Sequence, residues 1–380
     1  MANVDDKVLL PITKSLDGFT NNFHKNLANA FEENLVSSPL SAHVVLSMVT
    51  CGAEDSTHEE LRQALQLPED QSVLQEGYKA FIEYINNLPK VTLKVANKIY
   101  VNHLGNIEKD FQKLTKDCFH SESEPMNFGL SDESAGKINK WCEEQTDGKI
   151  KNLVAAADFS DNTGVVLLSA IYLKAQWKNL FKVKDTEDRR FYLNKNEHIY
   201  VPTMTTKQEF FYKPMPELNA KVIGLQYTNE DLMMVIIVPN DIDGLKDVEA
   251  NLEKFDIDYA GEFRRKECEV KLFLPKFKIE TTIDMQPHLE KMGVKLAFTE
   301  DANFEKISDV LGLLIDKVVQ KAFIAIDEFG TEAGAASCVV MSWREVPPTL
   351  KVDRPFVYQI VDMKRRFVLF SGHVVNPLKV

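Results

Sequence analysis

The chain has 380 residues, of which 44% are hydrophobic and 27% are charged, a composition typical of globular proteins rather than disordered or fibrous ones. Its formal net charge of −12 opposes binding to nucleic acid, because affinity for phosphates comes mainly from Lys and Arg. The longest apolar runs, such as Leu232 to Pro239, are far shorter than the roughly 18 residues that a membrane-spanning helix needs. Neither nucleic acid nor a membrane is expected as a partner.

Cysteine usage and catalytic motifs indicate no metal site, cofactor or enzyme. The five cysteines are widely spaced and form no C-x-x-C pair, so free thiols are expected. The chain also lacks the G-x-S-x-G, H-E-x-x-H and G-x-x-x-x-G-K-[ST] motifs of hydrolases, zinc proteases and nucleotide-binding proteins. We therefore expect no cofactor, no bound metal and no catalytic residues.

The first third of the sequence predicts helices. Near the N-terminus a large apolar residue recurs every four positions, which places these side chains on one helix face. A second helix is expected to begin at Ser38-Pro39, where the Ser hydroxyl can cap free N–H groups. A third is expected to begin at Ser56-Thr57, with Glu59 or Glu60 completing a capping box. The face of the first helix consists of Phe19, Phe23, Leu27 and Phe31.

Strand patterns become frequent from about residue 91. Between Val270 and Glu280 the apolar alternation changes parity after Pro275, which predicts a strand broken or bulged at that proline. No Pro/Gly/Ser-rich linker or internal repeat is present, so residues 1–380 are interpreted as a single mixed domain of the α+β class. The predicted strands are Val91–Val101, Val165–Trp177, Leu232–Val238, Glu269–Glu280, Ala322–Asp327, Phe356–Val361 and Phe367–Val375.

The segment from Glu328 to Ser337 differs from the rest of the sequence because most of its side chains are small. A flexible loop is one interpretation, since glycine and small residues pack little and keep backbone freedom. The alternation of side chains along the segment supports a second interpretation, a strand that can insert into a sheet. The odd-numbered positions are uncharged and small or medium in size, as a strand inserted into a sheet over packed helices would require. Those positions are Thr331, Ala333, Ala335, Ser337 and Val339.

The residues that follow this segment suit recognition by a protease. Pro347-Pro348 holds the chain extended, and proteases bind extended substrates. Arg344 is suited to a carboxylate at the base of a trypsin-like specificity pocket. The sequence Trp343-Arg344-Glu345 is therefore a candidate recognition and cleavage site for a protease.

Short motifs along nearly the whole chain resemble the serpin family. Each motif is weak alone, but together and in this order they are very specific. The motifs are Asn34-x-x-x-Ser38-Pro39-x-Ser41, Cys51-Gly52-Ala53, Thr57-His58-Glu59-Glu60-Leu61, Val95-Ala96-Asn97-Lys98-Ile99-Tyr100, Ile138-Asn139-Lys140-Trp141, Thr146-Asp147-Gly148-Lys149-Ile150, Ala170-Ile171-Tyr172-Leu173-Lys174 with Trp177, Leu274-Pro275-Lys276-Phe277, Ile326-Asp327-Glu328-x-Gly330-Thr331-Glu332-Ala333, Arg354-Pro355-Phe356 and Phe370-x-Gly372-x-Val374-x-Asn376-Pro377.

The resemblance implies a serpin fold with a large central mixed sheet, further β-sheets, about eight to nine helices and an exposed reactive loop at about residues 328–350. In serpins the bond that the protease cuts usually lies sixteen residues after the hinge glutamate, which from Glu328 gives Arg344–Glu345. Counting back eleven residues from Pro355 gives the same bond. A slip of one residue leaves Trp343 as the alternative, which would suit a chymotrypsin-like protease.

The resemblance also implies a mechanism, in which the chain is a suicide substrate that forms a covalent acyl complex with a serine protease. The cleaved loop would insert into the central sheet and distort the attached protease. A monomer with no cofactor and no metal is expected. The hinge of the loop would consist of Glu328, Gly330, Thr331, Glu332, Ala333, Gly334, Ala335, Ala336 and Ser337.

A sheet-opening region follows from the same resemblance. Trp177, Lys276 and Glu328 would lie where the loop first enters the sheet, with Lys276 and Glu328 as a candidate ion pair. Ordinary core and surface roles are the alternative for these residues. Ser38 and Ser41 would lie beneath the sheet centre, where their simpler role is helix capping.

Two positions depart from the family pattern. Serpins usually have Asn where this chain has Ser169 and His where it has Gln320, and those two side chains normally share a hydrogen bond. Ser and Gln can still supply a donor and an acceptor, with the shorter side chain offset by the longer one. A rewired but satisfied buried pair is therefore expected, and the opening of the sheet is the behaviour on which these two departures bear.

A serpin that acts as a binding or carrier protein, without inhibiting, is the alternative function. No bulky, charged or Pro residue stands on the inserting face, which favours inhibition. Residues 69–90, the region that some serpins use for heparin, carry more acidic than basic residues, so heparin is not expected. The two ends of the chain resemble secreted serpins without their signal peptide, which predicts an extracellular location, with a cytoplasmic one as the alternative.

Overall fold

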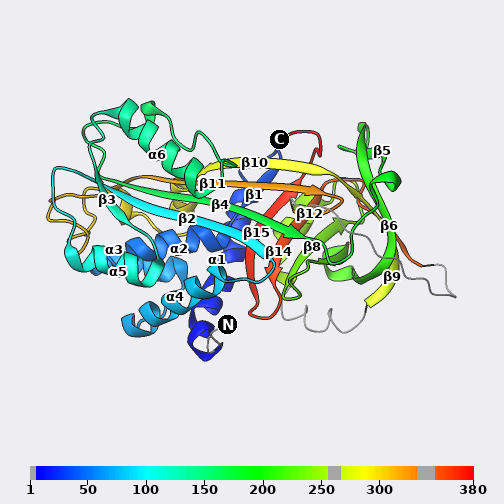
Figure 1. Cartoon of the computed structure of the whole chain (residues 1–380), viewed down its shortest axis with the longest axis horizontal. Coiled ribbons are helices and arrows are strands. Elements are labelled where there is room, and N and C mark those ends of the chain that lie inside the picture. The colour runs from blue at the N-terminus through cyan, green and yellow to red at the C-terminus, as the bar shows by residue number, and fades with distance from the viewer. Residues whose placement is uncertain (1–5, 256–266, 332–346) are drawn as a thin grey trace.

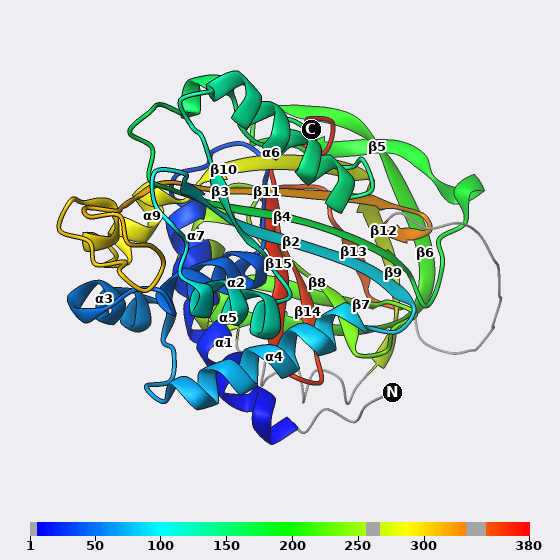
Figure 2. The same ribbon diagram turned by 60° about the vertical axis from the view of Figure 1, so that its left-hand side comes forward.

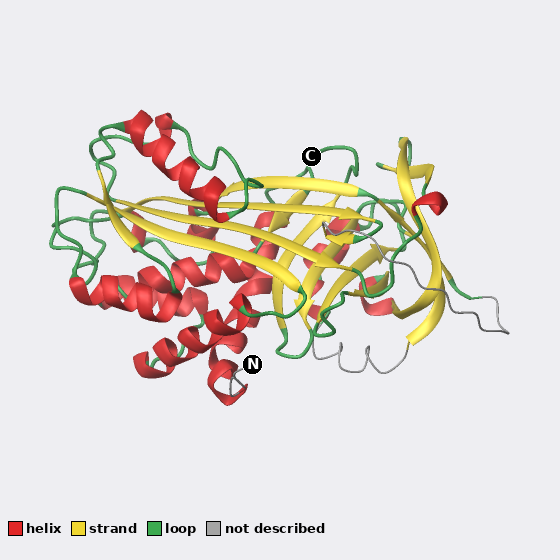
Figure 3. Ribbon diagram, viewed as in Figure 1, coloured by secondary structure: helices red, strands yellow, loops and turns green. Residues whose placement is uncertain are grey.

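The computed structural model describes residues 6–255, 267–331 and 347–380. Figure 1 shows a long sheet with most helices gathered below one end of it, while further strands fill the other end. Figure 3 shows the same division by secondary structure. No helix within the described ranges is long and apolar enough to cross a membrane.

The described residues form eight α-helices, within the number expected from the sequence. All twelve residues of α2 are buried, because this helix lies between the other helices and both sheets. α1 is amphipathic and buries Phe19, Phe23 and Leu27 completely, as their spacing predicts. The helices are α1 (Asp6–Ala28), α2 (Pro39–Thr50), α3 (Asp55–Leu65), α4 (Gln71–Asn86), α5 (Lys109–Phe119), α6 (Ser131–Gln145), α7 (Leu245–Ala250) and α9 (Gln286–Lys291).

A six-stranded mixed sheet forms the long layer in Figure 1. Its central strands β4 and β11 run parallel, while β2 pairs with β4 and β10 pairs with β11 in antiparallel fashion. In sheet order the strands are β10 (Phe277–Asp284), β11 (Ile315–Asp327), β12 (Gly330–Thr331), β4 (Val165–Gln176), β2 (Val91–Asn102) and β3 (Ser123–Met126).

A nine-stranded sheet contains the remaining strands. It begins at β1, which contacts the six-stranded sheet, and ends at β13 beside β9. Its strands are β1 (Leu35–Ser37), β15 (Phe367–Val374), β14 (Phe356–Asp362), β8 (Leu232–Pro239), β7 (Ala220–Gln226), β6 (His198–Met215), β9 (Glu267–Pro275) and β13 (Thr349–Lys351), with β5 (Glu187–Tyr192) paired to β6.

Helices cover both faces of the six-stranded sheet, as Figures 1 and 2 show. Successive residues of β4 point to opposite faces, so Leu167 and Ile171 pack in the core with α1, α2 and α4. Leu168 and Tyr172 pack on the other face with α6. Because both faces are covered, nearly every residue of β4 is buried, which explains its continuous apolar sequence.

The predicted break at Pro275 is confirmed. β9 ends at Pro275 and β10 begins at Phe277, and the two strands belong to different sheets. The change in apolar parity therefore marks the point at which the chain passes from the nine-stranded to the six-stranded sheet. Lys276 lies at this crossing, between the two strands.

The two predicted helix starts have different outcomes. Ser38 caps α2 as expected, since its hydroxyl accepts a hydrogen bond from the Ser41 N–H. The predicted capping box of α3 is wrong, because that helix begins at Asp55 and has no side-chain cap. Its Glu60 carboxylate instead accepts hydrogen bonds from the distant N–H groups of Lys295 and Leu296.

Two leucines of α1 allow a matched test of the core. Leu16 is 1% exposed and Leu10 is 49% exposed. Leu16→Ala leaves a cavity and is expected to lower the free energy of unfolding by about 2–4 kcal/mol. Leu10→Ala is expected to cost about 1 kcal/mol or less. Guanidinium unfolding followed by tryptophan fluorescence measures both, and equal losses would contradict the placement of α1.

Candidate functional site

The strands β4 and β11 are parallel neighbours along most of their length and separate at one end. Their pairing runs from Ile315 opposite Val165 to Phe323 opposite Tyr172. Beyond that point β12 lies between them and pairs antiparallel with both. The start of the segment that the sequence singles out is thus already a short strand inside the six-stranded sheet (Figure 1).

Gly330 allows the chain to enter between β4 and β11. Its φ of +139° lies in a region that residues with a side chain rarely adopt. A Cβ atom at this position would lie 2.2 Å from the carbonyl oxygen of Ala175, well inside van der Waals contact. Only glycine can therefore pass between the two strands in this conformation.

Thr331 is the first side chain that enters between the strands, and it is 1% exposed. Its hydroxyl lies 2.9 Å from the hydroxyl of Tyr227. The Tyr227 ring in turn stacks on Trp177, with ring centroids 4.6 Å apart. Burial raises the pKa of Tyr227 far above its ordinary value, so this phenol remains a neutral hydrogen-bonding group.

Trp177 also holds the turn that leads into the loop. Its indole Nε1 donates to the carbonyl of Asp327 at 3.0 Å, and its backbone N–H donates to the carbonyl of Phe329 at 2.9 Å. Trp177 is 2% exposed, so the turn is bound to the rigid end of β4. These contacts place Glu328 and Gly330 in a defined position.

Glu328 forms an ion pair at this entrance. Its carboxylate lies 2.7 Å from the Lys276 ammonium and accepts a second hydrogen bond from the Thr186 hydroxyl at 2.8 Å. Burial raises the pKa of Glu328, but the hydrogen bonds from Lys276 and Thr186 outweigh that effect and hold the pKa below its ordinary value. Lys276, at the crossing between the sheets, thereby joins the loop to the body of the protein.

A second cluster lies deeper, under the paired part of β4 and β11. The side-chain amide of Gln320 makes two hydrogen bonds of 2.8 Å with the backbone N–H and C=O of Ser38. Because one Ser38 group must donate and the other must accept, these bonds fix which end of the amide carries nitrogen. The Ser38 hydroxyl donates to the carbonyl of Leu369 in β15. Gln320 and Ser38 thus join the six-stranded sheet to the start of α2 and to the nine-stranded sheet.

Ser169 and Gln320 face each other across β4 and β11. Gln320 Nε2 donates to the Ser169 hydroxyl over a long 3.4 Å. The Ser169 hydroxyl is 2.6 Å from that of Ser41, and Ser41 donates to Asn97 Oδ1 in β2 at 3.0 Å. Since Gln320 Nε2 can only donate and Asn97 Oδ1 can only accept, every hydroxyl proton in this chain points from β11 towards β2. The buried pair expected from the sequence is present, and it continues through Ser41 to a third strand.

The structure brings the expected sheet-opening residues together in two groups. Trp177, Lys276 and Glu328 lie at the loop entrance, while Ser38, Ser41, Ser169 and Gln320 lie under the sheet. Of the expected hinge, Gly330 and Thr331 are also described. The other hinge residues and the expected reactive bond lie outside the described residues: Glu332, Ala333, Gly334, Ala335, Ala336, Ser337, Trp343, Arg344 and Glu345.

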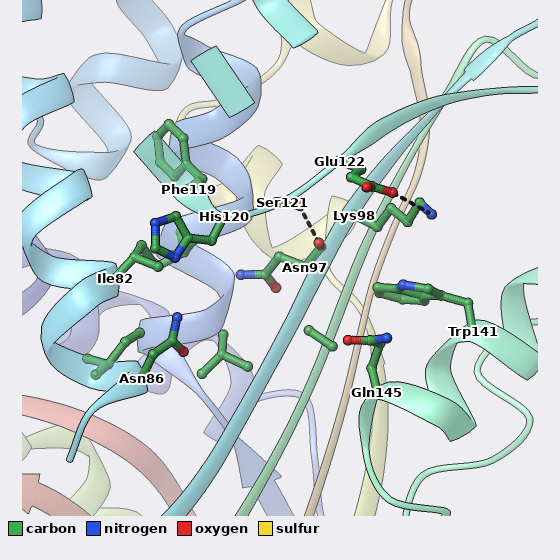
Figure 4. A pocket seen from close by; sticks show the side chains of 14 residues that line it. Ile82, Asn86, Asn97, Lys98, Phe119, His120, Ser121, Glu122, Trp141 and Gln145 are labelled. Carbon is green, nitrogen blue, oxygen red and sulfur yellow. Dashed lines mark hydrogen bonds and ion pairs between the residues drawn. The ribbon is translucent and has the colours of Figure 1, made fainter. Parts of the chain in front are cut away.

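Sequence analysis missed three residues of these groups. Tyr227 contacts Thr331, Thr186 contacts Glu328, and Asn97 ends the hydrogen-bond chain. Asn97 (Figure 4) lies in one of the motifs that resemble the family, and that motif is the sequence feature that could have identified it. Tyr227 and Thr186 are more than a hundred residues from their partners and carry no local pattern.

Nothing in the described part of the chain suggests a metal centre. No group of three or more His, Cys, Asp or Glu side chains there is arranged to hold a metal ion. The four cysteines described, Cys51, Cys118, Cys142 and Cys268, are free thiols. Burial raises the pKa of Cys51 to about 12, so this thiol stays protonated and is a poor nucleophile at neutral pH.

Comparison with known proteins identifies the family. The family model described as "Serpin (serine protease inhibitor)" matches residues 14–377. Alaserpin of Manduca sexta is 36% identical and the match covers 96% of this chain and 94% of that protein. The crystal structure of Serpin48, described as a highly specific serpin of the insect Tenebrio molitor, superposes with a TM-score of 0.88 at 32% identity, covering 96% and 98% of the two chains.

The chain therefore belongs to the serpin family. The fold that the resemblance predicted is confirmed, as is the class of protease inhibitor rather than enzyme. The structure of human thyroxine-binding globulin complexed with thyroxine is also similar, with a TM-score of 0.88 at 28% identity over 98% of this chain and all of that one. The same fold thus occurs in a protein whose structure contains a small ligand.

The ion pair at the loop entrance gives a pH-dependent prediction. Lys276→Met leaves Glu328 buried without its charged partner and is expected to lower the free energy of unfolding at pH 7 by about 1–3 kcal/mol. The folded pKa of Glu328 is lowered, so its stabilising effect is present above the unfolded pKa near 4.5 and is lost as the pH falls below it. Unfolding measured from pH 7 to pH 3 should show the difference from wild type shrinking below about pH 4.5.

Lys278→Met is the matched control for this prediction. Lys278 lies two residues further along the chain, on β10, and its ammonium is placed over the Phe323 ring, 5.3 Å from the centroid. Its removal is expected to produce a small loss that does not vary between pH 7 and pH 3. A loss for Lys276→Met that is the same at both ends of the pH range would refute the role given to the pair.

The Ser169 and Gln320 pair can be tested with a double-mutant cycle. Ser169→Asn and Gln320→His each introduce one residue of the usual serpin pair and disturb a fully buried network. We expect each single substitution to destabilise the protein, and the double variant to recover about 0.5–3 kcal/mol relative to their sum. Urea unfolding of the four proteins measures this coupling, and simple additivity would show that the two side chains do not act as a pair.

Proposed function

We propose that this chain is a suicide-substrate inhibitor of a serine endopeptidase with trypsin-like specificity. In this proposal the protease serine attacks the carbonyl carbon of Arg344, the bond to Glu345 breaks, and the amine of Glu345 leaves with a proton. The product is an ester between the protease serine and Arg344. The residues 328–350 act as the reactive loop of one domain that comprises residues 1–380.

The observation that carries this proposal is the position of β12. Gly330 and Thr331 lie between β4 and β11 and pair antiparallel with both strands. A loop that continued in the same direction would replace the parallel β4–β11 ladder with two antiparallel ladders, which are slightly more stable per residue. Cleavage at Arg344 would release the loop from its far attachment and allow this exchange.

The lengths of the strands agree with such an insertion. β4 has 12 residues and β11 has 13. Thirteen steps separate Thr331 from Arg344 in the sequence, which spans roughly 43 Å in an extended strand. Full insertion would therefore carry Arg344, with the attached protease, from one end of the sheet to the other.

The residues of the site have distinct parts in this proposal. Lys276 and Glu328 hold the entrance, and Trp177 fixes the turn before it. Gln320 and Ser169 must separate as the strands part, so their long 3.4 Å hydrogen bond is a weak point of the closed sheet. The proposal includes a monomeric inhibitor that acts outside the cell, with no cofactor and without heparin.

Two alternatives remain for the experiment to decide. One is a chymotrypsin-like target that cleaves after Trp343. The other is a serpin that binds or carries a ligand without inhibiting, for which the similarity to thyroxine-binding globulin is the only support. The neutral hydroxyl of Thr331 at the entrance favours inhibition, because no charged or bulky group has to be buried there.

Incubation with trypsin tests the proposal directly. The wild-type chain of 43.2 kDa is expected to form an SDS-stable complex with trypsin and to release the fragment 345–380, identified by mass spectrometry. Arg344→Ala is expected to lower the rate of complex formation with trypsin at least a hundredfold, because the specificity pocket loses its charged partner. Arg190→Ala, which removes an exposed arginine on β5, is the matched control and should react like wild type.

The same experiment separates the alternatives. Complex formation with chymotrypsin and a fragment 344–380 would assign the bond to Trp343. Cleavage of the loop without a complex, and without a rise in the melting temperature of the cleaved chain, would reject inhibition in favour of a carrier.

A further inference from the structure

Three titratable side chains that the proposed inhibition does not use meet in the interior of the protein. His24 on α1 is 0% exposed, His373 on β15 is 1% exposed and Glu249 on α7 is 5% exposed. Figure 2 shows β15 passing beside α1, and α1 also contacts α7. The three side chains therefore connect elements that are far apart in the sequence.

Both ring nitrogens of His373 face hydrogen-bond acceptors. Nδ1 lies 2.6 Å from Oε1 of Glu249, and Nε2 lies 2.6 Å from the backbone carbonyl oxygen of Glu33. A carbonyl and an ionised carboxylate can only accept, so both nitrogens of His373 must carry a hydrogen. Since a neutral imidazole carries hydrogen on one nitrogen alone, His373 is an imidazolium in this arrangement and forms an ion pair with Glu249.

Glu249 depends on this partner. Within the described ranges its ion pairs are with His373 and, at 3.8 Å, with His24, and none is with Lys or Arg. A carboxylate buried this deeply is costly without a positive partner. A proton on the carboxyl group instead would leave the imidazole neutral, which is disfavoured because imidazole is the stronger base. The imidazolium of His373 is thus the charge that allows Glu249 to be buried.

His24 is the neutral member of the cluster. Burial lowers its pKa to about 4, so its ring carries one hydrogen at neutral pH. Its Nδ1 lies 2.8 Å from the Ser371 hydroxyl, while its Nε2 lies 3.8 Å from Glu249 and has no hydrogen-bond partner among the described residues. A bare Nε2 would direct its lone pair at the carboxylate, so the hydrogen belongs on Nε2 and Ser371 donates to Nδ1.

The other charged side chains around the cluster, as far as the structure describes them, face water. The strand neighbours of His373 are apolar, Leu35 on β1 and Val357 on β14. The carboxylate of Glu33 is exposed and paired with Lys379 at 3.1 Å. The charged residues on α1, on α7 and just after α7 that lie nearest in sequence are exposed: Lys25, Lys246, Asp247, Glu253 and Lys254. None of them replaces the proton of His373 as the partner of the buried carboxylate.

The cluster attaches the strand β15 to two helices. Ser371 and His373 are two residues apart on β15 and so point to the same face, where they contact His24 of α1 and Glu249 of α7. Loss of the proton from His373 would leave one ring nitrogen with a lone pair facing an acceptor 2.6 Å away. An attraction between β15 and its neighbours would thereby become a repulsion.

We propose that His24, Glu249 and His373 form a buried proton-binding site that holds β15 against α1 and α7, and that β15 loosens when alkaline solution removes the proton. In the unfolded chain an imidazole loses its proton above about pH 6.5, while the folded site keeps it. The folded state then binds one proton more than the unfolded state, so its stability falls as the pH rises above about 6.5. The proposal concerns the uncleaved chain and is independent of protease inhibition.

NMR of the full chain labelled with ¹⁵N in histidine tests the protonation directly. Long-range ¹H–¹⁵N spectra distinguish an imidazolium, with hydrogen on both ring nitrogens, from a neutral ring. At pH 7 the signal that disappears in His373→Gln is expected to be that of an imidazolium. The double variant with His373→Gln and Glu249→Gln serves for the assignment if His373→Gln alone does not fold.

Hydrogen exchange measured by mass spectrometry tests the loosening of β15. Protection factors compare each amide with an unstructured peptide at the same pH, so the ordinary acceleration of exchange by base is removed. Above pH 7 the protection factor of Phe367–Val374 is expected to fall about tenfold per pH unit until the folded site loses its proton. The protection factor of Val91–Asn102, in the six-stranded sheet, is expected to stay nearly constant.

Two variants and one control locate the site. His373→Gln cannot carry the proton and is expected to lower the protection of β15 at pH 7 at least tenfold and to remove its dependence on pH. Adding Glu249→Gln removes the buried charge as well, and is expected to restore part of the protection, again without dependence on pH. His198→Gln changes an exposed histidine of β6 in the same sheet and should behave like wild type.

The outcomes decide the proposal. A ring of His373 with one bare nitrogen at pH 7 would overturn it. Protection of β15 that does not change between pH 7 and pH 9 would also overturn it. An equal fall in β15 and β2 would reject the loosening of β15, because it would report unfolding of the whole chain. A dependence on pH that persists in the double variant would assign the effect to other groups.

Discussion

The parallel contact between β4 and β11 is the constraint on which the rest of this structure depends. It closes the centre of a sheet that would otherwise have a gap, and helices cover it on both faces. Parallel ladders are slightly less stable than antiparallel ones, so this closure is held by more than its backbone hydrogen bonds. The side-chain bonds that Gln320 makes to Ser38 and Ser169 supply part of the difference.

The two ends of this junction differ in physical character. At the loop entrance the contacts are an ion pair, an aromatic stack and a threonine hydroxyl, which hold a short strand in place between β4 and β11. Under the sheet the contacts are uncharged hydroxyls and amides, which can exchange partners at a lower cost than buried charges. In the proposed mechanism such a sheet would open from one end while its core stays packed.

The hydrogen bonds that link Gln320 to Asn97 all point in the same direction across the six-stranded sheet. This chain of bonds starts at β11, crosses β4, passes the first turn of α2 and ends at Asn97 in β2. The edge of the sheet is therefore connected to its centre by a few directed bonds rather than by apolar packing alone.

Local spacing in the sequence determined the elements and the family: the Ser38 cap, the break at Pro275 and the small residues after Glu328 each depend on neighbours within a few positions. Only the tertiary structure decided which distant groups meet. Glu59 or Glu60 was expected to complete a capping box in its own helix, yet Glu60 bonds backbone N–H groups more than 230 residues away. Tyr227 likewise meets Thr331 across 104 residues. Such contacts are absent from the sequence pattern because a polar side chain bonds whichever partner the packed elements bring within about 3 Å.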